Sequence, residues 1–255
     1  NIVCCLGEVY KQNSQESSVV WVIRRIWRKL QGRGRRQHQK FSDASFSELQ
    51  DYVKSWRLTG NLKDTEEKIR DAFGNSPDLI LRQIRFGANP RIQILIGHLD
   101  GMVDTAFLTN GVIRPISNGP PDSAYQSLKA APQGEAVYTL LKNQLLQISA
   151  VQEADSLETA LELLGRGFAV LFVQGVPPCL ACEVHGWAER DIDEPGTEAS
   201  IRGSRQGFVE NRRINTSMLR RQIVSPLLWL EELQVGAVTK TTITIAYIKG
   251  IANQG

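Results

Sequence analysis

Apolar residues recur at helical spacing in several stretches of the chain. Between residues 156 and 167, Leu157, Leu161 and Leu164 fall on one helical face, and Asp155 with Glu158 predicts where that helix begins. Similar patterns predict further helices over 64–73, with Asp64 and Glu67 at its start, and over 103–116, 135–148 and 208–223. Helices therefore recur along the chain from about residue 64 to residue 223.

Other stretches have the short apolar runs that are typical of strands. The predicted strands form three pairs, each joined by a short turn: 79–86 with 91–99, 168–175 with 179–186, and 227–236 with 239–250. Because strands are connected both by tight turns and by helices, we expect mixed sheets and an α/β fold. The pattern predicts two small α/β subdomains joined by a helical connection.

Three segments follow from this pattern. Residues 1–45 form a basic leader that is partly disordered or an amphipathic helix, 46–150 form the first α/β subdomain, and 151–255 form the second. With 42% apolar residues the 255-residue chain can bury a sizeable core. We expect a domain that folds as a soluble object.

The net charge of +3 is an average over unlike parts. Residues 1–40 hold nine Lys or Arg against two acidic residues, whereas the rest of the chain holds 21 basic against 25 acidic residues. Within the basic part, residues 19–30 predict a short amphipathic helix, which fits either contact with an anionic membrane surface or a loosely docked leader. The mildly acidic remainder argues against a nucleic-acid surface, which needs clustered basic residues.

Targeting signals are sparse. The apolar runs are shorter than the roughly 18 to 20 residues that cross a bilayer, and no cleavable signal peptide is visible. Four cysteines in two close pairs, with no sign of export, favour a reducing, cytoplasmic setting.

The spacing of Cys179 and Cys182 suggests two kinds of chemistry, a redox pair or half of a zinc site. A redox pair normally lies at a helix N-terminus, whereas these cysteines lie in a predicted strand, where positions three apart point to opposite faces. The remaining candidate ligands supply no matching second pair: Cys4, Cys5, His38, His98 and His185. We expect no metal, treat a CxxC oxidoreductase as a remote alternative, and expect both thiols to pack as small apolar groups.

Motifs for other chemistry are weak. The chain has neither a Walker-type phosphate loop nor a GxSxG elbow, and residues 203–207 could hold an anion before a helix or form a plain turn. Two carboxylate pairs could act as acid and base, but carboxylates near helix starts are more often caps: Asp100 with Asp104, and Glu194 with Glu198. We therefore expect a protein that is not an enzyme and that needs no cofactor.

Charges are ordered in the polar stretch from 187 to 221. Its first part, 187–200, holds five acidic residues and one arginine, and its second part, 202–221, holds six arginines and one acidic residue. Such blocks either pair internally or leave some arginines to bind a carboxylate ligand or an acidic partner. Exposed ion pairs contribute only about 0 to 1 kcal/mol each, so stability alone does not require so many arginines.

The stretch from 186 to 223 resembles the signature of the A subunits of bacterial spore germinant receptors of the GerA type. The residues that carry the resemblance are Gly186, Trp187, Arg190, Glu194 to Glu198, Arg202, Gly203, Arg205, Gly207, Phe208, Glu210, Asn211, Asn215, Arg220 and Arg221. The similarity continues through 235–253 and extends more loosely back to about residue 60. Ser204 and Gln206 depart from the family, which usually has Pro and often has Glu at these places.

The resemblance implies a receptor role. It predicts the cytosolic N-terminal domain of a membrane-bound subunit in the spore inner membrane, on the cytoplasmic (core) side, with membrane attachment beyond residue 255 and with B and C subunits as partners. The implied function is germinant sensing or signal relay, with small nutrients such as amino acids or sugars as ligands; the alternative is a scaffold that only assembles the receptor. The ligand- or partner-binding residues implied are Arg190, Glu194, Glu198, Arg202, Arg205, Glu210, Asn211, Asn215 and Arg220.

Overall fold

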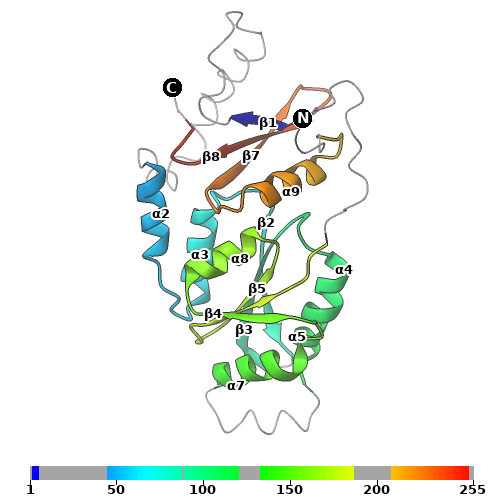
Figure 1. Cartoon of the computed structure of the whole chain (residues 1–255). Coiled ribbons are helices and arrows are strands. Elements are labelled where there is room, and N and C mark those ends of the chain that lie inside the picture. Colours follow the sequence, from blue (N-terminus) through cyan, green and yellow to red (C-terminus); the bar gives the residue numbers. More distant parts are fainter. Residues whose placement is uncertain (1, 6–44, 88, 121–132, 187–207, 253–255) are drawn as a thin grey trace, which may run out of the picture.

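The computed structural model of the chain describes residues 2–5, 45–87, 89–120, 133–186 and 208–252 (Figure 1). The predicted basic helix over 19–30 lies outside these residues, as does the whole acidic block, 187–200, of the polar stretch. Among the helices described, none is long and apolar enough to cross a bilayer.

A five-stranded sheet forms the centre of the molecule. Its strand order is β2-β3-β5-β6-β4, and every neighbouring pair is antiparallel. The strands are β2 (Leu79–Phe86), β3 (Asn89–Leu99), β4 (Val151–Ala154), β5 (Ala169–Val173) and β6 (Cys179–Cys182). The two hairpins predicted from the sequence, β2 with β3 and β5 with β6, are confirmed.

Helices cover both faces of this sheet (Figure 1). The apolar cluster on one face contains residues of α2 (Phe46–Lys54), α3 (Leu62–Ala72) and α8 (Leu157–Gly165). The cluster on the other face contains residues of α4 (Thr105–Leu108), the π-helical turn η2 (Thr109–Ile113), α5 (Arg114–Asn118), α7 (Gln133–Leu140) and the π-helical turn η4 (Leu141–Leu145). The result is a helix–sheet–helix sandwich.

The position of strand β5 in the sheet explains why all of its residues are apolar. All five of its residues are buried. Val170 and Phe172 pack into the cluster that contains α8, whereas Ala169, Leu171 and Val173 pack into the cluster on the opposite face. Successive residues of a strand point to opposite faces of the sheet, and both faces are covered here. A polar side chain at any position of β5 would therefore be buried.

A smaller, mixed sheet lies beside the sandwich. Its strand order is β1-β8-β7, comprising β1 (Ile2–Cys5), β7 (Leu228–Val235) and β8 (Thr241–Ile248), with β1 parallel and β7 antiparallel to β8. The closing strand pair predicted from the sequence is confirmed, but the strand at 2–5 was not predicted in the leader. Helix α9 (Arg212–Gln222) lies between this sheet and the sandwich (Figure 1).

Several predicted helix boundaries are wrong in detail. Helix α3 begins after Asn61, whose side chain accepts hydrogen bonds from Lys63 N and Asp64 N, so Asp64 is not its N-cap. Helix α8 begins after Ser156, which caps Thr159 N, and not after Asp155. In both cases an amide or hydroxyl one turn or one residue away provides the cap that the carboxylate was expected to provide.

The two sheets do not divide at residue 150, where the boundary between subdomains was predicted. Strand β3, from the first predicted segment, pairs with β5, from the second, over Ile94 to Gly97. The mixed α/β class is confirmed, and the division between sheets separates β2 to β6 from β1, β7 and β8.

Candidate functional site

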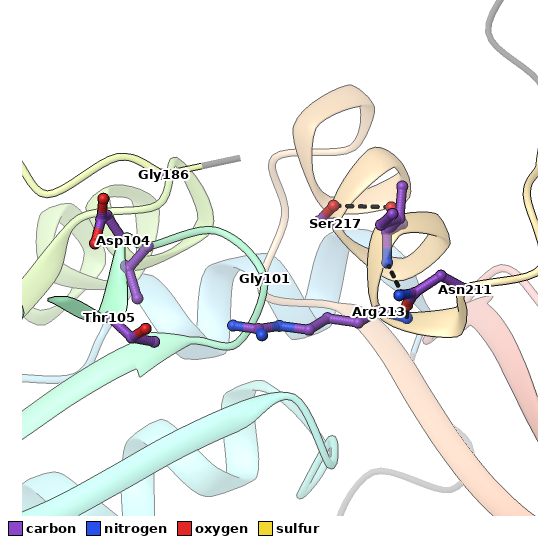
Figure 2. A pocket seen from close by; sticks show the side chains of 9 residues that line it. Gly101, Asp104, Thr105, Gly186, Asn211, Arg213 and Ser217 are labelled. Carbon is purple, nitrogen blue, oxygen red and sulfur yellow. Dashed lines mark hydrogen bonds between the residues drawn. The ribbon is translucent and has the colours of Figure 1, made fainter. Parts of the chain in front are cut away.

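A pocket of about 320 Å³ opens where α9 faces the turn after β3 (Figure 2). It is lined by Gly101, Val103, Asp104, Thr105, Gly186, Asn211, Arg213, Ile214 and Ser217. Gly186 is the last described residue before the segment 187–207, and Asn211 and Arg213 lie near the start of the described part that follows this segment. The pocket is therefore lined by the first residue of the signature stretch and by residues from its later part.

One wall of the pocket comes from the turn between β3 and α4. Asp104 caps α4, because its Oδ1 accepts hydrogen bonds of 2.8 Å from Ala106 N and from Phe107 N. Gly186 packs so closely on this turn that a Cβ there would lie 2.2 Å from Asp104 N. The first glycine of the signature is thus required by the contact between two backbones.

The opposite wall is the first half of α9. The Asn211 side chain accepts hydrogen bonds from Arg213 N at 3.0 Å and from Ile214 N, so it is the N-cap of α9. The buried Asn215 amide bonds to both backbone groups of Val209, at 2.8 Å to its N and at 2.6 Å to its O. These two asparagines fix how the chain enters α9.

An ion pair lies at the pocket. Arg213 Nη2 lies 2.7 Å from Asp100 Oδ1, and both side chains are about half exposed, at 51% and 42%. Figure 2 shows the Arg213 side chain extending from α9 toward the turn that contains Gly101. A carboxylate that enters the pocket can therefore compete with Asp100 for this guanidinium.

A second arginine of α9, Arg220, is buried. Arg220 is 1% exposed, and it donates from Nε and Nη2 to the two oxygens of Asp78, at 2.8 and 3.0 Å. Its Nη1 donates to Leu228 O at 2.7 Å, and its guanidinium lies 5.2 Å from the centre of the Phe73 ring. Arg220 is therefore an internal group and not a surface ligand-binding residue, which corrects the interpretation of the sequence.

The other predicted site residues lie in different places. Asn211 lines the pocket, while Asn215 holds the backbone and Glu210 is exposed at the start of α9. The predicted site residues outside the described part of the chain are Arg190, Glu194, Glu198, Arg202 and Arg205. The sequence interpretation missed Arg213, Asp100 and Asp78 as partners, although Arg213 stood in the arginine-rich block and Asp100 had been considered as an acid.

The electrostatics near the pocket disfavour a charged histidine. Burial lowers the pKa of His98, near the end of β3, and the nearby positive charge of Arg213 lowers it further, while Asp100 and a backbone hydrogen bond oppose the shift. We expect His98 to be neutral at physiological pH.

The thiols of Cys179 and Cys182 lie in different apolar clusters on opposite faces of the sheet. Burial raises the pKa of Cys179 to about 12 and also raises the pKa of Cys182. The geometry therefore does not support the oxidoreductase alternative, because neither thiol forms a thiolate readily and the two do not face each other. Within the described ranges, His, Cys, Asp and Glu side chains form no group of three or more that could hold a metal ion.

A family model and several similar proteins point to one family of spore germination proteins. The family model described as Bacillus/Clostridium GerA spore germination protein matches residues 67–255. The chain is 32% identical to Spore germination protein KA of Bacillus subtilis, over 77% of this chain and 34% of that protein, and 27% identical to Spore germination protein B1 of the same organism, over 77% and 38%. It thus spans about a third of the length of these relatives.

A solved structure matches as well. The N-terminal domain of the A subunit of the Bacillus megaterium spore germinant receptor GerK3 superimposes with a TM-score of 0.59 at 27% identity, covering 78% of this chain and 69% of that chain. The chain therefore belongs to the GerA family of spore germination proteins, and it has the fold of the N-terminal domain of a germinant receptor A subunit.

Proposed function

We propose that this chain is the part of a germinant receptor A subunit that takes part in sensing the germinant or relaying its signal, so that germination is triggered. In this proposal the domain lies on the cytoplasmic (core) side of the spore inner membrane and contacts the B and C subunits of the same receptor. The observation that carries the proposal is the pocket at the start of α9, because residues of the family signature stretch, among them Gly186 and Asn211, line it.

The chemistry of this pocket suits a small polar molecule with a carboxylate. Its walls supply a guanidinium, a hydroxyl and an amide from Arg213, Thr105 and Asn211. Planar guanidinium groups bind carboxylates with two parallel hydrogen bonds. Amino acids fit this chemistry, whereas sugars would bind through the neutral groups alone.

The alternative is a scaffold that only assembles the receptor. The exposed Glu210 and Arg213 near the start of α9 suit a polar contact with another subunit equally well. The two functions differ in what a change at the pocket would do. A scaffold residue affects assembly and therefore every germinant, whereas a sensing or relay residue affects the response of an assembled receptor.

Reversing the charge of Arg213 separates these functions. In spores that carry the full-length A subunit with Arg213→Glu, we expect normal amounts of the A, B and C subunits and a nutrient response shifted at least about fivefold in concentration, since one charge-assisted contact is lost. Arg166→Glu is the matched control, because Arg166 pairs with Glu162 at the exposed end of α8, and Arg166 does not line the pocket.

If Arg213→Glu lowers the amounts of the A, B and C subunits together and weakens the response to every germinant, the scaffold function is supported. An unchanged response with all subunits present would exclude the pocket from sensing and relay. For direct binding, amide chemical shifts of this chain are followed during titration with a panel of amino acids and sugars; no shift in residues 100–105 or 211–217 would rule out a nutrient site in the pocket.

A further inference from the structure

Two aspartates mark one end of the central hairpin. Leu79 of β2 is paired with Leu99 of β3, so Asp78 and Asp100, the next residues outward, lie side by side. The Asp100 amide donates a hydrogen bond of 2.7 Å to Asp78 O. The start of β2 and the end of β3 therefore present two carboxylates to the same side of the sandwich.

Helix α9 binds both carboxylates through arginines seven residues apart. Arg213 pairs with Asp100 and Arg220 pairs with Asp78. Because seven residues are close to two helical turns, the two arginines lie on one side of the helix. Helix α9 is thus attached to the five-stranded sheet at two points.

The same helix also holds the three-stranded sheet. Arg220 Nη1 donates to Leu228 O at the start of β7, and Arg212 Nη1 lies 3.2 Å from Glu232 Oε1 further along that strand. Arg220 therefore bonds to both sheets with one guanidinium, through Asp78 on one side and Leu228 on the other.

The segment that connects α3 to β2 adds further contacts between the two sheets, at the place, here called the junction, where Arg220 bonds to Asp78 and Leu228. The Trp229 indole donates to Ala72 O at 2.9 Å, and Leu230 N donates to Ser76 Oγ at 2.9 Å. Both donors belong to β7, whereas both acceptors precede β2. The start of β7 is therefore hydrogen-bonded along the connecting segment 72–78 that leads into the five-stranded sheet.

The contacts of α9 differ in strength. The pairs made by Arg212 and Arg213 are at least one-third exposed on each side, so water and salt screen them. The Arg220–Asp78 pair is almost fully buried, at 1% and 8% exposure, and removal of either partner leaves a buried charge unpaired. Arg220 thus holds α9 firmly in place, whereas the ion pair of Arg213 at the pocket can break more easily.

From this arrangement we infer that α9 is the element that couples the pocket to the three-stranded sheet, with Arg220 as the positioning residue that makes the two sheets move together. The inference rests on the proposed role of the domain in sensing or relay. A change at Arg213 shifts the first half of α9, and the bonds of Arg220 transmit that shift to Leu228 and β7.

Arg220→Lys tests the coupling, because lysine keeps the charge but replaces the three guanidinium nitrogens that bond to Asp78 and Leu228 O with a single ammonium nitrogen. In this chain, we expect hydrogen exchange of the Trp229 indole and the Leu230 amide to accelerate at least about tenfold, while the amides of β5 stay protected. Leu141→Ala is the control for general destabilisation, since Leu141 is buried in the cluster on the far face of the sandwich. That variant is expected to accelerate β5 at least as much as the junction.

The functional arm uses the full-length A subunit in spores. With Arg220→Lys we expect normal subunit amounts and a germination rate reduced at least about fivefold for every nutrient, whereas Leu141→Ala at equal subunit amounts is expected to germinate normally. Asp78→Leu combined with Arg220→Met removes the charges without leaving one unpaired, and is expected to give the same defect in a folded chain.

Unchanged exchange at Trp229 and Leu230 in Arg220→Lys would overturn the coupling. Accelerated exchange with normal germination would overturn its role in relay. If Arg213→Glu alters the nutrient response and Arg220→Lys does not, the proposed function stands and this inference fails; if neither variant alters the response, both fail.

Discussion

At the residue scale, several residues have roles that their sequence positions did not indicate. Gly74 has φ +62°, and a Cβ there would lie 2.1 Å from the Trp229 ring. The glycine therefore serves two purposes, since it adopts a left-handed conformation and allows the indole to pack on the backbone. Its contact is 155 residues away along the chain, so local sequence shows only that a turn is favoured there.

A comparison of two glycines distinguishes the energetic cost of the left-handed conformation from that of the close contact. Gly175 has φ +82° and no atom within 4 Å of an added Cβ, so Gly175→Ala should cost only the left-handed conformation, about 1 to 2 kcal/mol. Gly74→Ala adds a steric overlap and should cost about 3 kcal/mol or more in the free energy of unfolding. Urea unfolding of both variants measures the difference, and equal losses would show that the Trp229 contact contributes nothing.

At the scale of elements, sequence pattern predicted where helices and strands occur better than where they begin. Asn61 and Ser156 begin helices that Asp64 and Asp155 were expected to begin. The predicted helix over 103–116 is described as α4, η2 and α5, with a π-helical turn in the middle. In that turn Gly111 contacts the backbone of Gln147, whose N donates to Gly111 O at 2.9 Å. Such tertiary contacts do not appear in a periodicity.

The N-cap of α9 gives a prediction at this scale. Asn211→Ala removes the acceptor for Arg213 N and Ile214 N, and we expect a loss of about 1 kcal/mol in the free energy of unfolding. Asn211→Asp keeps an acceptor and adds a negative charge near a helix N-terminus, so it should be neutral or slightly stabilising. Urea titrations compare the two variants with the unaltered chain, and an equal loss in both would contradict a capping role.

At the scale of the whole molecule, long-range pairing decides how the halves of the chain combine. Strand β3 lies between β2 and β5, so the central sheet takes strands from both sides of residue 150. The segment 151–255 also contributes α9, whose Arg220 reaches back to Asp78 across 142 residues of sequence. The subdomain boundary predicted at 150 therefore crosses both the central sheet and the junction.

Fragments test this arrangement directly. We expect neither 46–150 nor 151–255 to fold alone, because each exposes one side of the β3–β5 pairing and half of two apolar clusters. Circular dichroism and the dispersion of amide resonances report folding, and co-expression of the two fragments is the control in which native-like spectra should return. Cooperative unfolding of either fragment on its own would favour independent subdomains.

The sequence by itself determined the α/β class, three strand pairs, the helical face of Leu157, Leu161 and Leu164, and the family signature. These features depend on local spacing, because alternation and helical periodicity are properties of neighbouring residues. The opposite placement of Cys179 and Cys182 also followed from spacing alone and is confirmed.

Only the tertiary structure decided what Arg213 and Arg220 of the arginine-rich block do. Arg213 and Arg220 carry the same charge within two turns of one helix, yet one is half exposed at the pocket and the other is enclosed between two sheets. Their partners, Asp100 and Asp78, are brought to α9 by the pairing of β2 with β3. Burial and partner depend on that packing, and packing brings together residues that the sequence keeps far apart.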